Sequence, residues 1–151
     1  MNGDTIFPPN SIARYCPPSK VEHDPITLEP LAVSLENFKP KISEIGTNKG
    51  ISVNWLEKHA KPKIKDTINS IRERMESYPY NIKKNGAFAI ATVKYIIEAG
   101  LRNKSKLSVV ENHHKLIDGS VDDSHALIIG IKVDDELLQQ EIALNVDIYS
   151  I

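Results

Sequence analysis

The stretch PKIKDTINSIRERMESY, residues 62–78, decides most of what we expect of the fold. Apolar side chains recur in it at intervals of three or four residues: Ile64, Ile68, Ile71, Met75 and Tyr78. This is the period of an amphipathic α-helix with one buried face. The sequence therefore predicts a helix over 62–78, with its charged residues on the opposite, solvent-facing side.

A second stretch, AFAIATVKYIIEA over residues 87–99, is apolar on most faces. A buried strand has a similar composition, but the length of the run favours a helix. Gly100 follows directly and suits a helix C-terminus. We therefore expect a second, central helix over 87–99.

From Leu107 onwards the apolar residues alternate with polar ones, which is typical of strands. The runs LSVVENHHKLI (107–117) and HALIIGIKV (125–133) flank the turn-rich DGSVDD (118–123), and together they predict a hairpin. EIALNVDIYS (141–150) predicts a third strand, and the segment after Pro30 is a candidate for a fourth at a sheet edge.

Six of the nine prolines lie within the first thirty residues. Proline fixes the backbone φ angle and lacks an N–H donor, so we expect an extended arm over residues 1–25 rather than a helix or a central strand. Residues 26–151 are then a single α+β domain. Its two main helices pack on one face of a three- to four-stranded, mainly antiparallel sheet.

Composition narrows the class of protein. The chain has 151 residues, of which 40% are hydrophobic and 26% charged, as in one folded domain. It has no apolar run near the ~20 residues that cross a bilayer and no secretory signal pattern at its start. The lone Cys16 cannot form an internal disulfide. We therefore expect a cytoplasmic protein without a membrane partner.

Charge is strongly segregated along the chain. Residues 39–106 hold fifteen Lys and Arg against six Asp and Glu, whereas residues 107–151 hold two against nine. Three explanations are open: the two segments neutralise one another in the fold, the basic side meets an acidic protein, or it meets nucleic acid phosphates. The candidate contact residues on the basic side are Lys61, Lys63, Lys65, Arg72, Arg74, Lys83 and Lys84.

The hairpin over residues 111–125 is rich in imidazole and carboxylate groups, which are ligands of zinc and related metals and form general-base pairs. Its candidate ligands are His113, His125 and Asp123. Adjacent histidines on a strand point to opposite faces, so His113 and His114 cannot both reach one ion. The chain has no H-E-x-x-H or paired-cysteine motif, so we expect neither a metal nor another cofactor.

These patterns favour a small non-enzymatic interaction or regulatory protein that uses the basic helical face and the N-terminal arm. Its expected partner is another protein with an acidic surface, with a homo-oligomer as one form of such a contact. The first alternative is a nucleic-acid-binding protein that uses the helix over 62–78. The second is a metal-dependent hydrolase or metal-binding protein at the 111–125 hairpin.

Overall fold

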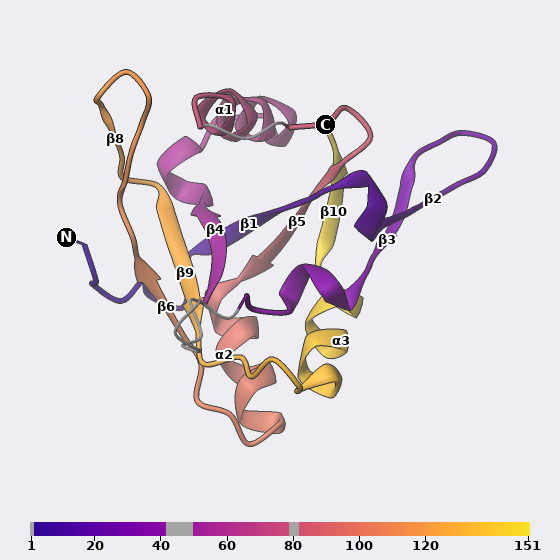
Figure 1. The fold of residues 1–151 in the computed structure, drawn as a ribbon, viewed down its shortest axis with the longest axis vertical. Coiled ribbons are helices and arrows are strands. Elements are labelled where there is room, and N and C mark those ends of the chain that lie inside the picture. Colours follow the sequence, from indigo (N-terminus) through magenta and orange to yellow (C-terminus); the bar gives the residue numbers. More distant parts are fainter. Residues whose placement is uncertain (1, 42–49, 79–81) are drawn as a thin grey trace.

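The computed structural model describes residues 2–41, 50–78 and 82–151. Its main sheet has six strands in the order β10-β5-β1-β4-β9-β6, and each neighbouring pair is antiparallel (Figure 1). These strands are β1 (Ser11–Cys16), β4 (Ile51–Trp55), β5 (Ala87–Thr92), β6 (Ser108–Glu111), β9 (His125–Ile129) and β10 (Asp147–Ser150). The predicted α+β class is confirmed, but the sheet is larger than the three to four strands predicted.

Three α-helices cover the two faces of the sheet: α1 (Ile64–Glu76), α2 (Val93–Arg102) and α3 (Glu136–Leu144). In Figure 1, α1 lies towards the top of the view, and α2 and α3 lie towards the bottom. One core cluster contains Val53, Ile96 and Leu138, and the other contains Ile71 and Phe88. The helices therefore do not share one face, which corrects the predicted two-helix layer.

The helix predicted over 62–78 is present as α1, which is shorter and covers residues 64–76. Ile68, Ile71, Met75 and Tyr78 are buried on its sheet-facing side. The first residue of the predicted stripe, Ile64, is 42% exposed. The apolar stripe therefore packs on the sheet except at its N-terminal end.

The helix predicted over 87–99 is wrong in its first half. Residues 87–92 form β5, which pairs with β1 on one side and β10 on the other. The chain turns into α2 at Thr92, whose side-chain oxygen accepts a hydrogen bond from the Tyr95 N–H at 3.0 Å. A central strand buried on both faces is apolar all round, so its pattern resembles that of a buried helix.

The strand predicted over 141–150 is correct only for its last residues, which form β10. Residues 136–144 form α3, with Asp135 as its N-cap. Leu138, Gln139, Ile142 and Ala143 are buried, at helical spacing. The apolar residues that alternate over 142–148 therefore belong to two elements, the end of α3 and the start of β10.

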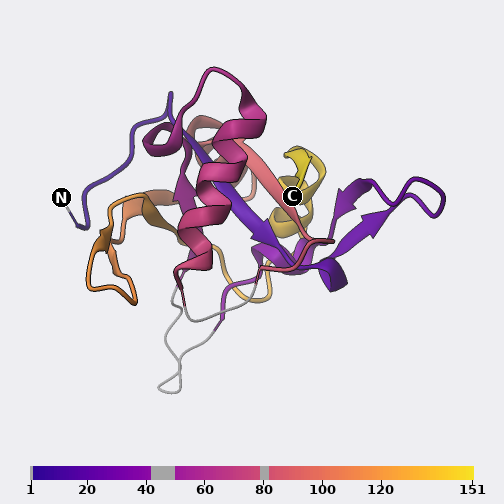
Figure 2. The same cartoon turned by 90° about the horizontal axis from the view of Figure 1, so that it is seen from above.

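The predicted N-terminal arm supplies part of the main sheet. β1 lies between β5 and β4, and Ile6 and Ile12 are buried in the core. The segment after Pro30 forms β3 (Pro30–Val33), which pairs with β2 (Val21–His23) in a separate two-stranded sheet. In Figures 1 and 2 this hairpin projects from the side of the main sheet.

The hairpin predicted over 107–133 is confirmed. β6 pairs with β9, and the pairing continues into the short strands β7 (His114–Lys115) and β8 (Val121–Asp122). Figure 1 shows this hairpin extending beyond the sheet on the side opposite the β2–β3 hairpin. Its base lies close to α1, because Arg74 of the helix contacts Asp122 at the end of β8.

Candidate functional site

The seven basic residues predicted to contact a partner fall into three groups. Lys61, Lys63 and Lys65 are exposed at the N-terminal end of α1. Arg72 and Arg74, in the C-terminal half of α1, are half-buried. The exposed Lys83 and Lys84 follow the C-terminal end of the helix. The two groups of exposed lysines thus lie beyond opposite ends of α1.

The two arginines of α1 are engaged within the fold. Arg72 lies 3.7 Å from Glu76, and Arg74 lies 3.4 Å from Asp122. Lys58 similarly pairs with Asp123 at 3.5 Å. Ion pairs therefore join the basic middle of the chain to its acidic last third, as internal neutralisation requires.

The exposed lysines at the start of α1 have no such partner. Within the described ranges, no carboxylate forms an ion pair with Lys61, Lys63 or Lys65. Their positive charge is therefore left on the surface.

A groove lies between the N-terminal half of α1 and β10. We call it the α1–β10 groove; it measures about 340 Å³ and is lined by Ile64, Lys65, Ile68, Asn69, Tyr149, Ser150 and Ile151. Most of these side chains are apolar, and Lys65 stands on the lining itself. The groove thus places apolar surface beside the unpaired lysines.

The hairpin does not assemble the predicted metal ligands. His113 Nε2 lies 3.1 Å from Glu111, whereas His125 Nδ1 contacts the Asn112 carbonyl at 2.7 Å. Asp123 points to Lys58. Among the described residues, no group of three His, Cys, Asp or Glu side chains is arranged to hold a metal ion.

His114 and His125, the first residues of β7 and β9, stack with ring centroids 3.7 Å apart. Tyr78, two residues beyond the end of α1, packs its ring against both of them. Burial, and then the neighbouring His114, lower the pKa of His125 from 6.5 to about 4. His125 is therefore neutral at pH 7, and its Nδ1–H donates to the Asn112 carbonyl.

A buried polar cluster lies beside these rings, beneath α1. Asp122 accepts hydrogen bonds from the Tyr78 hydroxyl and from Ser124 Oγ, the latter at 2.5 Å. Ser124 Oγ also lies 2.8 Å from His59 Nε2, and His59 Nδ1 lies 2.9 Å from Ser70 Oγ. Since the Ser124 hydroxyl donates its hydrogen bond to Asp122, it accepts from His59 Nε2–H, and His59 Nδ1 accepts from the Ser70 hydroxyl.

Serine, histidine and aspartate here do not form a catalytic triad. In a triad the histidine bridges the serine and the carboxylate. Here Ser124 is the bridge, and it is only 1% exposed. Asp122 and His59 are also buried, so the cluster is closed to a substrate and acts as a polar element of the core.

Charge in this cluster is set by hydrogen bonding. Burial alone would raise the pKa of Asp122, but hydrogen bonds from Ser124 and Tyr78, with the charge of Arg74, bring it below the ordinary value. Burial, and next the charge of Arg74, lower the pKa of His59. The cluster therefore holds an ionised carboxylate and a neutral imidazole at pH 7.

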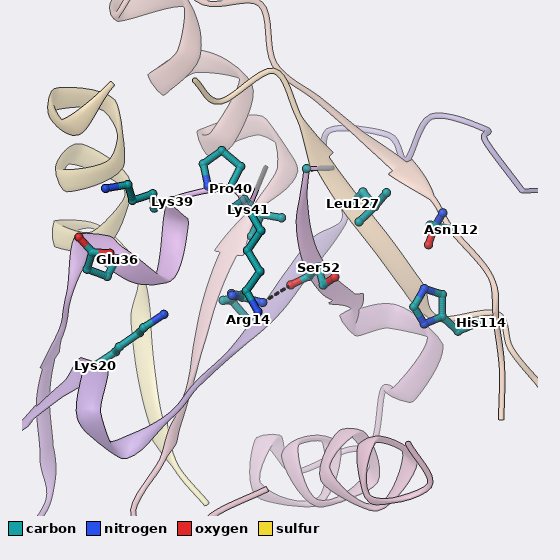
Figure 3. Close-up of a pocket in the computed structure, with 12 residues that line it drawn as sticks. Arg14, Lys20, Glu36, Lys39, Pro40, Lys41, Ser52, Asn112, His114 and Leu127 are labelled. Atoms are coloured by element: carbon teal, nitrogen blue, oxygen red, sulfur yellow. Dashed lines mark hydrogen bonds between the residues drawn. The ribbon is translucent and has the colours of Figure 1, made fainter. Parts of the chain in front are cut away.

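A larger pocket opens where β1 and β4 separate. We call it the β1–β4 pocket; it measures about 700 Å³, and its charged lining residues are Arg14, Lys20, Glu36, Lys39 and Lys41. Asn112 and His114 line it as well. In Figure 3, Lys20 extends towards Arg14, His114 lies on the opposite side, and the Lys39 ammonium points away.

Sequence reasoning missed both the buried polar cluster and this pocket. The cluster joins residues that are far apart in the sequence, and Tyr78 fits the pattern as part of the helical stripe. Arg14 and Lys20 lie in the segment expected to be an extended arm. No local pattern marks either group, because tertiary folding alone brings their members together.

Cys16 is buried, and burial raises its pKa to about 12. It is therefore a protonated core side chain at neutral pH rather than a reactive thiolate.

Comparison of the chain with protein-family models, curated proteins and solved structures found no match. Among the described residues, no helix has both the length and the apolar character needed to cross a bilayer.

Proposed function

We propose that this protein is a non-enzymatic binding protein whose partner is an acidic segment of another protein, received at the α1–β10 groove. The observation that carries the proposal is an apolar groove with a lysine on its lining and two more lysines shortly before it in the chain, none of which forms an ion pair with a described carboxylate. Lys65 lies on the groove lining, and Lys61 and Lys63 precede it directly. Positive charge around an apolar surface suits a segment that combines carboxylates with apolar side chains.

Exposed apolar groups support this choice of surface. Ile64 is 42% exposed although it belongs to the apolar stripe of α1. Tyr149 and Ile151 meet it across the groove. A partner side chain seated between them would extend the apolar contact that the stripe leaves incomplete.

The edge position of β10 gives a partner main-chain contacts as well. In the part of the chain that the structure describes, β10 pairs with β5 alone. The opposite edge strand, β6, is flanked by the N-terminal segment, where Thr5 bridges Val110. β3 packs close to β10 without pairing with it. A partner segment would therefore meet β10 from the side of α1, where its side chains enter the groove.

The other residues predicted to contact a partner are not part of the proposed site. Arg72 and Arg74 are used by Glu76 and Asp122. Lys83 and Lys84 are at the far end of α1, and Ile6 and Ile12 of the predicted arm are buried in the core. The expected basic face is thus narrowed to Lys61, Lys63 and Lys65.

Fluorescence anisotropy with a labelled peptide of alternating glutamate and leucine tests this function. The triple variant Lys61→Glu/Lys63→Glu/Lys65→Glu should weaken peptide binding by at least about tenfold, because it replaces attraction by repulsion. The matched control Lys83→Glu/Lys84→Glu changes charge at the other end of α1 and should leave binding unchanged.

Two results would oppose the proposal. One is equal weakening per reversed charge by the triple variant and its control, which would indicate an unspecific response to net charge. The other is tighter binding of a labelled random single-stranded oligonucleotide than of the peptide, with a steep loss of affinity as salt rises. That result would favour a nucleic-acid-binding function.

A further inference from the structure

The end of the β2–β3 hairpin carries apolar side chains that the fold leaves uncovered. Ile26 is 89% exposed and Leu28 is 71% exposed. Both belong to the loop between the two strands, residues 24–29, which we call the hairpin tip. Figures 1 and 2 show the tip pointing away from the sheet and from α1. The fold therefore presents an apolar pair at the end of a projection, where apolar surface marks a contact with another molecule.

Hydrogen bonds fix the conformation of the hairpin tip. Asp24 Oδ1 accepts from the N–H groups of Ile26 and Thr27, each at 2.8 Å, and the Asp24 carbonyl accepts from the Leu28 N–H at 2.9 Å. Leu28 has φ of +63°, a left-handed conformation that is uncommon for any residue other than glycine. The turn thus holds both apolar side chains in one arrangement, which lowers the entropy lost when they dock.

The root of the hairpin is attached to the body of the protein. His23 Nε2 donates to the Asn85 carbonyl at 2.7 Å, and β3 packs beside β10. Because the root is held on both strands and the tip points away from α1, the tip does not fill the α1–β10 groove of its own chain. Its contact surface must lie on a second molecule.

The hairpin is acidic as well as apolar. Residues 21–38 contain no Lys or Arg, and the hairpin itself contains Glu22, Asp24 and Glu29. Glu22 and Glu29 are exposed, and within the described ranges neither of them forms an ion pair. The hairpin therefore combines carboxylates with exposed apolar side chains, which is the chemistry proposed above for the occupant of the α1–β10 groove.

The groove complements the hairpin in both charge and polarity. Ile64 and Tyr149 offer apolar surface to a side chain such as Leu28. The exposed lysines at the start of α1 carry the charge opposite to that of Glu22 and Glu29. Complementary charge of this kind selects a partner and sets its orientation.

We infer that the acidic segment received at the α1–β10 groove is the β2–β3 hairpin of a second copy of this chain. The inference rests on the proposed function and names its partner. The apolar tip contacts Ile64 and Tyr149, while Glu22 and Glu29 face the lysines at the start of α1. Each copy has one hairpin and one groove, so mutual insertion closes the assembly as a two-fold dimer.

Sedimentation equilibrium of the whole protein tests this, and a dimer with a dissociation constant of about 10 μM is expected for such a small interface. The hairpin variant Glu22→Lys/Glu29→Lys and the groove variant Lys61→Glu/Lys63→Glu/Lys65→Glu should each weaken the dimer at least about tenfold, because each places like charges together. The control Lys83→Glu/Lys84→Glu should dimerise as the unchanged protein does.

A mixture of the hairpin variant and the groove variant is the sharpest arm of the experiment. In a mixed dimer, one hairpin and one groove both have their native charges, and the other pair has both charges reversed. The mixture should therefore dimerise at least about tenfold more tightly than either variant alone. A mixture that associates no better than its components would overturn the inference.

The apolar part of the contact is tested by Leu28→Asn. Asparagine tolerates positive φ, so the turn is kept while the apolar side chain is lost. The dimer should weaken about tenfold, as for a truncated apolar anchor. Leu101→Asn makes the same change at a leucine of α2 that is also exposed, and it should leave the dimer unchanged. Equal effects of the two variants would contradict the proposed contact.

The failure of this inference is distinguishable from the failure of the proposed function. A protein that stays monomeric up to about 1 mM, yet binds the glutamate–leucine peptide through the lysines at the start of α1, overturns the inference alone. A monomeric protein that does not bind the peptide overturns both. A dimer that is insensitive to the groove variant would place the interface elsewhere and would also overturn the inference.

Discussion

Arg74 of α1 places a guanidinium nitrogen 3.4 Å from Oδ1 of Asp122, whose side chain is fully buried at the end of β8. This contact joins the basic middle of the chain to its acidic last third. Tyr78, one turn further along the chain, donates to the other oxygen of the same carboxylate. Part of the charge segregation in the sequence is therefore cancelled inside the fold, whereas the lysines at the start of α1 stay exposed.

Removal of the Asp122 carboxylate is expected to destabilise the protein. Asp122→Ala leaves Tyr78 and Ser124 without their acceptor, which should lower the free energy of unfolding by about 3 kcal/mol. Urea denaturation measures this. Asp123→Ala removes an exposed carboxylate next to it and should change stability by less than about 0.5 kcal/mol. Equal effects of the two variants would mean that the buried cluster contributes nothing of its own.

The stacked histidines predict a loss of stability in mild acid. The pKa of His125 is about 4 in the folded protein against 6.5 for an unperturbed histidine. Between these values the unfolded chain binds a proton that the folded chain does not, so stability falls as the pH falls from 6.5 towards 4. The loss should reach about 3 kcal/mol. Asp122 does not add to this loss. Because its pKa is lowered in the folded protein, its stabilising effect is lost only as the pH falls below the ordinary value of 3.8.

Denaturation curves at several pH values check this, with His125→Asn as the comparison. An asparagine amide can still donate to the Asn112 carbonyl but does not titrate. The variant should therefore lose the part of the pH dependence that His125 causes while it stays folded at pH 7. The part due to His59, whose pKa burial also lowers, should remain. An unchanged slope between pH 6.5 and 4 would show that another group is responsible.

Alanine substitution at two glycines with positive φ distinguishes the cost of backbone strain from the cost of steric overlap. At Gly130, with φ of +107°, an added Cβ would lie 2.6 Å from the Lys106 carbonyl oxygen. At Gly119, with φ of +88°, nothing lies within 4 Å. Gly119→Ala should thus cost only the backbone penalty of about 1 kcal/mol, and Gly130→Ala should cost at least about 2 kcal/mol. Thermal unfolding compares them, and an equal cost would show that the Lys106 segment moves aside freely.

The sequence predicts those parts of this fold that carry their own periodicity. The stripe from Ile68 to Tyr78 is set by contact with one face of the sheet, so α1 could be recognised directly. The segment that begins at Ala87 could not, because a strand buried on both faces and a buried helix have the same apolar composition. Its one local signal is Thr92, a good N-cap residue where the strand ends and α2 begins.

The candidate sites were predictable only in part. The exposed lysines at the start of α1 follow from the helical period and the charge pattern. The groove beside them depends on β10, which approaches α1 only because β10 pairs with β5. The β1–β4 pocket depends on the separation of two strands, which no residue type in the sequence predicts. Nothing in the sequence around Arg14 indicates that it lines this pocket.

The binding proposal for the α1–β10 groove is tested most directly by backbone amide chemical-shift mapping, in which the glutamate–leucine peptide is titrated into ¹⁵N-labelled protein. The perturbed amides should cluster at Ile64, Lys65 and Ile68 of α1 and at Tyr149 and Ser150 of β10. Shifts that cluster instead at Lys83 and Lys84, or shifts spread evenly over all exposed lysines, would contradict it.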